Sequence, residues 1–219
     1  MKNLISRALT GTVYVILITF CILYNKWTYC ALFTVISIAC TTEFFVLLAK
    51  HGNNIRRHRL FGIAGAIYVL LPLSLLIYSV FTSPDFKHTS RFVMSLFIFL
   101  WVFDSTAYLV GSKFGRHRLC ERISPKKSWE GFCGGLFFTI LTAFILGSID
   151  FADIPPVHWI IFAVLTVISG TAGDLIESKF KRIIGVKDSG YALPGHGGFL
   201  DRFDSLLLTA YLIIIFLFI

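Results

Sequence analysis

Seven apolar stretches run through nearly the whole chain, and they constrain its fold more than any other feature. Each approaches the roughly 20 residues that a helix needs to cross a bilayer. They cover approximately residues 8–24, 28–49, 60–81, 92–111, 132–149, 157–173 and 203–219. Their periodicity is helical or uniformly apolar, without the alternation of an outer-membrane barrel. The sequence therefore predicts an all-α, polytopic integral membrane helix bundle with about seven transmembrane helices.

Composition excludes an ordinary soluble domain. Of the 219 residues, 56% are hydrophobic and 15% are charged, whereas soluble domains carry about 25% charged residues. Because the apolar stretches recur throughout, we expect one membrane domain over 1–219. Within it, residues 1–91 form the N-terminal spans, and residues 92–219 form the spans and long loops in which a site would be built.

The basic residues are distributed as membrane orientation requires. With a cytoplasmic N-terminus, the inside segments are 1–7, 50–59, 112–131 and 174–202, and they hold seventeen of the twenty Lys and Arg. Such an excess is typical of cytoplasmic loops. The net charge of +8 therefore indicates a membrane bilayer as partner, through orientation and anionic headgroups, and no nucleic acid.

The last inside segment concentrates acidic residues at helical spacing. Asp174, Glu177, Ser178 and Lys181 would share one face if the sixth span continued as a helix. Asp201 and Asp204 repeat the three-residue spacing of Asp174 and Glu177 at the start of the seventh span. Carboxylates at two neighbouring helix ends could share a hard cation such as Mg²⁺. Solvated ion pairs are the alternative for any single residue, but a whole set of such acids is costly without a partner.

A glycine-rich turn lies between these two groups of acids. The run Leu193-Pro-Gly-His-Gly-Gly198 permits close backbone approach to a ligand, as a phosphate-contacting turn requires. Solvated loop charge leaves this run unexplained.

Two upstream features could contribute to the same site. Asp104 is a carboxylate within the fourth span, with Tyr108 and Gly111 on the same helical face; an intramembrane acid is a functional candidate, with a structural hydrogen bond as the alternative. Glu43, in the second span, has no comparable surroundings in the sequence, and we interpret it as structural.

The second upstream feature is the stretch Ser124–Gly131, SPKKSWEG. Lys126 and Lys127, with flanking hydroxyls ahead of a glycine-rich helix start, would suit phosphate oxygens. Orientation charge is the alternative for the two lysines.

Together these residues resemble the signature of phosphatidate cytidylyltransferases (CDP-diacylglycerol synthases). The resemblance is carried by Ser178-x-x-Lys-Arg182, Lys187-Asp188, Leu193-Pro-Gly-His-Gly-Gly198 and Asp201-Arg-x-Asp204. Asp104-Ser-x-Ala-Tyr108 and Ser124-Pro-x-Lys-Ser-Trp-Glu-Gly131 are similar to two upstream motifs of that family. The similarity covers about residues 100–205.

The resemblance implies a Mg²⁺-dependent nucleotidyltransferase of phospholipid biosynthesis. Such an enzyme converts CTP and phosphatidate to CDP-diacylglycerol and pyrophosphate, here at the cytoplasmic face of the inner (cytoplasmic) membrane. It also implies Asp174 and Asp201 as metal ligands, with Asp204 close by as a further ligand or as support for the other two, and it leaves room for a second cation. A homodimer is compatible with such a bundle, and the sequence leaves the oligomeric state open.

We expect the following roles. The catalytic residues are the three aspartates with Lys181 and Arg182, the two cations clamping phosphate. Substrate binding is expected at Ser178, Lys187, Asp188, Gly195, His196, Gly197, Gly198, Arg202, Lys126, Lys127, Ser128 and Asp104. Whether the glycine turn holds triphosphate or cytidine is left open.

Three other functions remain as alternatives. A polyprenol, dolichol or phytol kinase, or an ether-lipid synthase, would share the membrane setting and the use of CTP. A transporter or channel would suit the intramembrane Asp104 and the Gly-broken spans, although the acids gather at one face. A non-catalytic membrane scaffold is the third alternative.

Overall fold

The computed structural model describes residues 2–51, 55–152, 154–186, 188–190 and 198–217. Within these residues the chain forms seven helices, each matching one predicted span. They are α1 (Lys2–Tyr24), α2 (Lys26–His51), α3 (Ile55–Thr82), α4 (Phe86–Phe114), α5 (Trp129–Ser148), α6 (Pro156–Ile183) and α7 (Leu200–Leu217). The prediction of an all-α membrane bundle is confirmed.

Short polar or proline-containing links set the helix ends. Asp85 caps α4 by accepting a hydrogen bond from the Lys87 amide, and Ser128 caps α5 by accepting one from the Gly131 amide. Side-chain oxygens at these positions satisfy amides that have no partner inside the helix. Pro156 opens α6 at a position where its missing N–H costs nothing.

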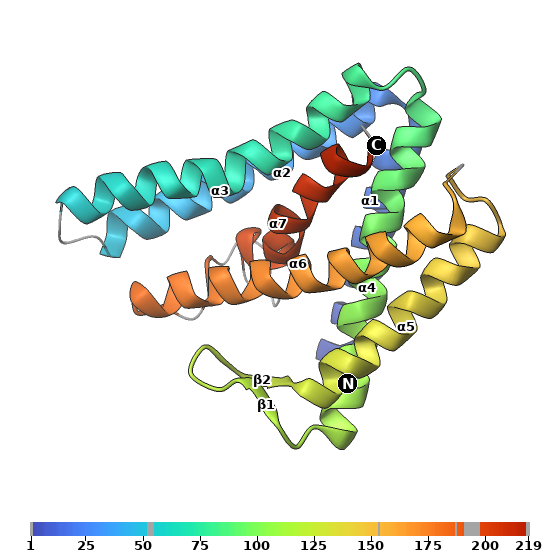
Figure 1. The fold of residues 1–219 in the computed structure, drawn as a ribbon. Helices are drawn as coiled ribbons and strands as arrows, with labels where there is room; N and C mark the ends of the chain where they lie inside the picture. Colours follow the sequence, from blue (N-terminus) through green and yellow to red (C-terminus); the bar gives the residue numbers. More distant parts are fainter. Residues whose placement is uncertain (1, 52–54, 153, 187, 191–197, 218–219) are drawn as a thin grey trace.

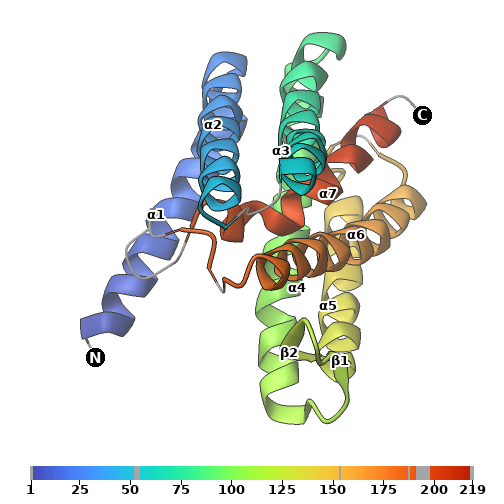
Figure 2. The ribbon, with the colours of Figure 1, turned by 90° about the vertical axis from the view of Figure 1, so that its left-hand side faces the viewer.

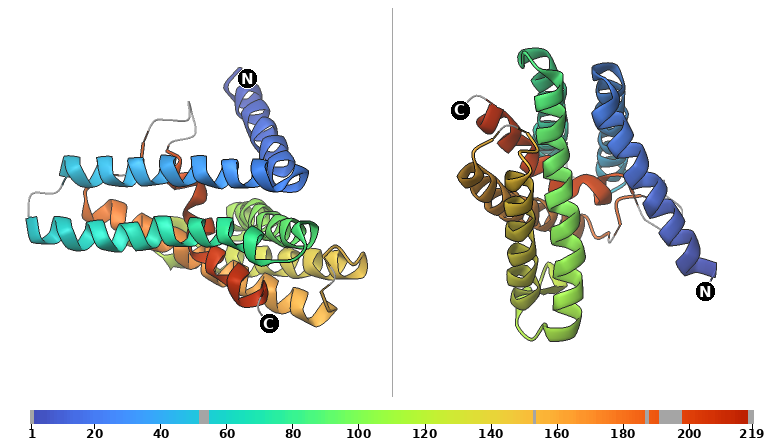
Figure 3. Two further views of the ribbon diagram at one scale, coloured as in Figure 1. Left: turned by 90° about the horizontal axis from the view of Figure 1, so that it is seen from above. Right: turned by 90° about the vertical axis from the view of Figure 1, so that its right-hand side faces the viewer.

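The helices pack as two hairpins joined by α6, α7 and α1. Figure 1 shows α2 and α3 lying side by side, and α4 beside α5, with α6 and α7 between the two pairs. The view from above in Figure 3 shows the same pairing, and in Figure 2 the N-terminal half of α1 leans away from the bundle.

The core is apolar and rich in aromatic rings. Phe92 stacks on Phe162 with centroids 4.4 Å apart, and Phe216 of α7 lies 5.0 Å from Phe162. Large apolar side chains also remain on the outside, for example Ile16 and Phe144, which are 62% and 63% exposed. Exposed apolar surface of this extent requires lipid as its surroundings.

Five helical segments within the described residues are long and apolar enough to cross a membrane. They are Lys26–Ala49, Gly62–Thr82, Phe86–Phe114, Trp129–Ser148 and Pro156–Ile183. Together with the outward apolar surface, they make the chain a multi-pass membrane protein. Which side faces the cytoplasm stays a prediction.

Two features refine the expected layout. α6 continues past the apolar stretch to Ile183, as the spacing of its acids predicted. The inside segment 112–131 contains a two-stranded antiparallel hairpin, β1 (Arg118–Cys120) and β2 (Ser124–Ser128). The hairpin was not predicted, because strands of three and five residues are too short for a periodic signal.

Close packing of α4 against α5 positions this hairpin. A Cβ atom built on Gly131 would lie 2.7 Å from the Ala107 carbonyl oxygen and 3.1 Å from the Gly111 Cα. Both are backbone atoms, which cannot rotate away. The two helices therefore approach as closely as they do only with glycine at this position.

We expect Gly131→Ala to lower the melting temperature of the detergent-solubilised protein, because overpacking of this kind costs about 1–3 kcal/mol. Gly11→Ala is the matched control, since a Cβ there would meet nothing within 4 Å, and Ala favours a helix over Gly by about 1 kcal/mol. Tryptophan fluorescence during heating measures both. Equal melting temperatures for Gly131→Ala and the wild type would contradict the close α4–α5 contact.

Candidate active site

A cavity of about 460 Å³ opens between α4, the hairpin and the start of α5. Its wall brings together the two upstream features of the sequence. Asp104, Tyr108 and Gly111 line it from α4, and Lys126, Lys127 and Ser128 line it from β2. The expectation that Asp104 shares a site with the lysine stretch agrees with this geometry.

The cavity carries positive charge on one wall. Arg118 joins Lys126 and Lys127 among its lining residues, opposite the single carboxylate of Asp104. The first turn of α5 lies at the same wall, where the Gly131 amide donates to the Ser128 hydroxyl. Helix N-termini and fixed cations favour anionic ligands.

Glu130 fixes the strand–helix corner beside the cavity. Its carboxylate accepts hydrogen bonds from the Arg116 and His117 amides at 3.1 and 3.2 Å, and it contacts His117 Nδ1 at 2.6 Å. Glu130, the acidic residue of the SPKKSWEG stretch, therefore has a structural role.

Lys127 joins this cavity to the acidic end of α6. Its Nζ forms an ion pair with Asp174 Oδ2 while the same side chain lines the cavity. Asp174 also accepts a hydrogen bond from the Ser178 hydroxyl at 3.0 Å, one helical turn later. The two parts of the sequence pattern, some fifty residues apart, are thus neighbours in one site.

The next turn of α6 carries a buried acid and a buried cation. Glu177 is 2% exposed, and its Oε2 lies 2.7 Å from Lys181 Nζ, although no hydrogen bond from a described residue satisfies either carboxylate oxygen. Because attraction between opposite charges depends weakly on direction, the Lys181 ammonium stabilises the Glu177 carboxylate at this separation. The sequence pattern included Glu177, but it gave no sign that Glu177 is the most buried acid of the group.

Lys181 lies between two carboxylates. Besides Glu177, its Nζ contacts Asp201 Oδ1 at 2.6 Å. It links α6 to the start of α7, so its charge is already compensated within the protein. The phosphate clamp predicted for Lys181 remains a proposal.

Asp201 is held by three donors. Its second oxygen accepts hydrogen bonds from the Ser189 amide at 2.9 Å and the Gly198 amide at 3.0 Å. Burial alone would raise the pKa of the Asp201 carboxyl, but the Lys181 ammonium and the two amides outweigh it and hold this pKa below its usual value. Asp201 is therefore ionised at neutral pH.

Asp204 completes the acidic group from α7. It lies within electrostatic range of Asp174 and Glu177, which bear the same charge, and of Lys127. Like charges this near one another are stabilised by a cation between or beside them, or by protonation of one of the acids.

The residues suit Mg²⁺ in type, but they do not form a complete cage. Within the described part of the chain, no three His, Cys, Asp or Glu side chains form a group that could hold a metal ion. Asp174 and Asp204 face a common region, whereas Asp201 is turned toward Lys181 and the Ser189 and Gly198 amides. Mg²⁺ is commonly held by one or two carboxylates together with substrate phosphates, so this donor set fits the ion.

The remaining predicted residues divide into three groups. Arg182, Asp188 and Arg202 are exposed around the site, and Ser128 is buried at the α5 cap. Lys187, Gly195, His196 and Gly197 lie outside the described residues.

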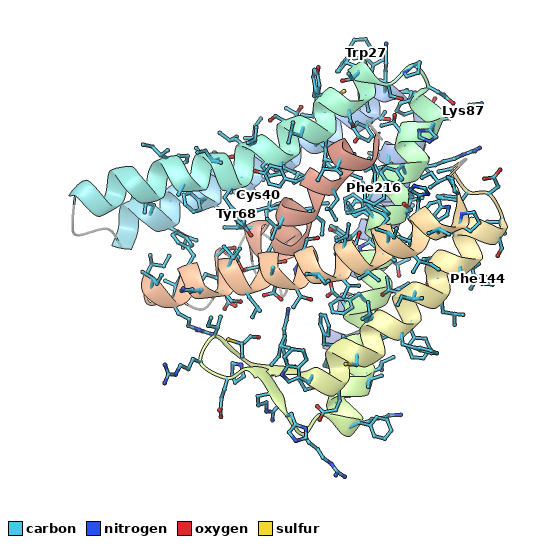
Figure 4. All side chains as sticks on the ribbon, viewed as in Figure 1. Trp27, Cys40, Tyr68, Lys87, Phe144 and Phe216 are labelled. Atoms are coloured by element: carbon cyan, nitrogen blue, oxygen red, sulfur yellow. The ribbon has the colours of Figure 1, made fainter. Side chains whose placement is uncertain are left out.

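Two further residues reach the site from the N-terminal spans. The Tyr68 hydroxyl of α3 donates to the Gly173 carbonyl at 3.0 Å, next to Asp174 (Figure 4). Glu43 of α2 accepts hydrogen bonds from the Phe199 and Leu200 amides, both at 2.9 Å, at the start of α7. The structural interpretation of Glu43 agrees with these bonds. Local spacing could not reveal its partners, which lie 146 to 157 residues away along the chain.

Comparison with known proteins gives a consistent result. The model of the cytidylyltransferase family matches residues 56–219. A phosphatidate cytidylyltransferase of Staphylococcus aureus (strain COL) is 46% identical over 119 residues, and one of Staphylococcus epidermidis (strain ATCC 12228 / FDA PCI 1200) is 45% identical over the same length. Each alignment covers 53% of this chain and 45% of the relative. The chain thus matches somewhat less than half the length of these relatives.

Proposed function

The chain belongs to the cytidylyltransferase family, and we propose that it transfers the cytidylyl group of CTP to phosphatidate. The products are CDP-diacylglycerol and pyrophosphate. The observation that carries the proposal is the Lys127–Asp174 ion pair, which joins a cation-lined cavity to a group of acids. The relatives named above are phosphatidate cytidylyltransferases, which supports the same reaction.

The chemistry asks for positioning and charge compensation more than for a base. An oxygen of the phosphatidate phosphate attacks the α-phosphorus of CTP, and the bond from that phosphorus to the β-phosphate oxygen breaks. The nucleophile is already anionic, so no strong base is required. The barrier comes from crowding negative phosphates together, which fixed cations lower by electrostatic stabilisation.

In our proposal, Lys126, Lys127 and the α5 N-terminus hold a phosphate group in the cavity. Asp104 orients Lys127 toward it from the opposite wall. Lys181 and Arg182 bind the departing pyrophosphate. To do so, Lys181 leaves the carboxylates of Glu177 and Asp201. Acyl chains stay in the bilayer while CTP enters from the water.

We propose Mg²⁺ as the cofactor, with room for a second cation. Asp174 and Asp204 would hold it, joined by Asp201 once Lys181 has left its carboxylate, and when bound it would neutralise phosphate charge as a Lewis acid. The like-charged acids around Asp174 support this assignment. We further propose that the protein works in the cytoplasmic membrane with its site on the cytoplasmic side, and that a homodimer is its assembled form.

The acceptor is tested by competition. Purified protein in nanodiscs is given CTP, Mg²⁺ and equal amounts of phosphatidate and a polyprenol, and the lipid products are identified by mass spectrometry. We expect CDP-diacylglycerol with pyrophosphate. Polyprenyl phosphate with CDP would identify a lipid kinase instead.

A further inference from the structure

The carboxylate of Glu43 holds together both described ends of the segment that precedes α7. Its Oε1 accepts a hydrogen bond from the Phe199 amide and its Oε2 accepts one from the Leu200 amide, both at 2.9 Å. Oε2 also accepts a hydrogen bond from the Ser189 hydroxyl at 3.2 Å. A side chain from α2 thereby caps α7 and contacts the residues on either side of 191–197.

No space is left around this carboxylate for larger neighbours. A Cβ on Gly198 would lie 2.5 Å from Glu43 Oε2, and one on Gly190 would lie 2.9 Å from Oε1. Two glycines therefore allow backbone to close directly on the acid. Because an acid within an apolar helix is costly unless paired, these backbone donors explain how Glu43 is accommodated in α2.

Ser189 transmits the contact to Asp201. Its hydroxyl donates to Glu43 and accepts from the Asp201 amide at 3.3 Å, while its own amide donates to Asp201 Oδ2 at 2.9 Å. Ser189 thus links Glu43 to Asp201, whose Oδ1 contacts Lys181.

We propose that Glu43 is a positioning residue for cytidylyl transfer. It fixes the start of α7, and through Ser189 it sets the orientation of Asp201. The inference rests on the proposed function for its catalytic part. Glu43 lies outside residues 56–219, the part of the chain that the family model matches, so the family resemblance does not assign it this role.

The test compares Glu43→Gln with the wild type in nanodiscs of the full chain. The amide NH₂ of Gln would face donors, so at least one of the three hydrogen bonds is lost with almost no change in size. We expect deuterium exchange at the Phe199 and Leu200 amides to become about 10-fold faster or more, because exchange reports local opening. We also expect kcat to fall about 10- to 100-fold, as for other groups that orient catalytic ligands, with the KM for phosphatidate unchanged.

Thr42→Val is the matched control on the same helix. The Thr42 hydroxyl is exposed and donates to the Ala39 carbonyl of its own helix. This variant should change neither exchange at α7 nor kcat. Ser189→Ala should reproduce the kcat effect of Glu43→Gln, because it interrupts the path to Asp201.

The outcomes separate the two proposals. Unchanged exchange at Phe199 and Leu200 in Glu43→Gln would overturn the anchoring role, whatever the turnover. Faster exchange with unchanged kcat would overturn the positioning role. A wild-type protein without CDP-lipid product would overturn the proposed function, while the exchange measurement would still decide whether Glu43 holds α7.

Discussion

Asp201→Asn is expected to lower kcat by about 100- to 1000-fold, the scale on which loss of a strong electrostatic group acts. One oxygen of Asp201 meets Lys181 and the other accepts the Ser189 and Gly198 amides. The asparagine NH₂ must oppose either the ammonium or the two amides, so the start of α7 cannot keep both contacts. Loss of the negative charge also removes one proposed metal residue.

The protein should still fold, because α7 is anchored elsewhere by buried side chains, including Phe203, Leu206 and Ala210. Circular dichroism in detergent checks this. Asp150→Asn is the control: it makes the same chemical change in the α5–α6 link, where Asp150 has a positive φ of 50° that Asn also tolerates. Turnover by Asp201→Asn within a few-fold of the wild type would remove Asp201 from the chemistry.

Asp174→Asn is expected to lower kcat by a similar factor, about 1000-fold, and yet to leave the melting temperature unchanged or higher. Asp174 pairs with Lys127 but repels Asp204. Neutralising it loses one partly exposed ion pair, typically worth about 1 kcal/mol or less, and relieves the repulsion. Loss of activity without loss of stability is the behaviour of a site residue that is held in place against its own electrostatics.

Kinetics and thermal unfolding of the same Asp174→Asn preparation test this directly. Glu121→Gln, a neutralised acid exposed in the hairpin turn, is its control. A large fall in melting temperature, with kcat reduced only in proportion to the unfolded fraction, would make Asp174 a structural residue.

Hydropathy predicted the helices well because lipid requires it. A segment that crosses a bilayer must satisfy its backbone internally and present apolar side chains along about 20 residues. This requirement can be recognised from each segment's own composition, so hydropathy predicted all seven helices of the described residues. The continuation of α6 to Ile183 followed from the i, i+3, i+4 and i+7 spacing of Asp174 to Lys181.

Contacts between distant segments were beyond such reasoning. The Lys127–Asp174 ion pair, the Tyr68–Gly173 hydrogen bond and the Glu43 cap depend on how helices pack. Nothing within one helix specifies its partner's register. Glu43 is the clearest case, since it lies in an apolar span and its hydrogen-bond donors within the described residues are Ser189, Phe199 and Leu200, far away in the sequence.

The state of Lys181 also differs from what spacing alone suggested. As a cation beside Arg182 it resembled a free phosphate ligand, but its ammonium lies between Glu177 and Asp201. A cation held by two acids can be released when an anionic ligand or a metal competes for them.

Cytidylyl transfer to lipid by this site is tested most directly by measuring which product receives each phosphorus atom of CTP. Purified protein in phosphatidate nanodiscs is given Mg²⁺ with CTP labelled at either the α- or the γ-phosphorus, beside Asp201→Asn at equal amount. We expect the label from the α-phosphorus in the lipid and the label from the γ-phosphorus in pyrophosphate. We expect neither labelled product from Asp201→Asn. Label from the γ-position in the lipid, or equal α-label with Asp201→Asn, would contradict it.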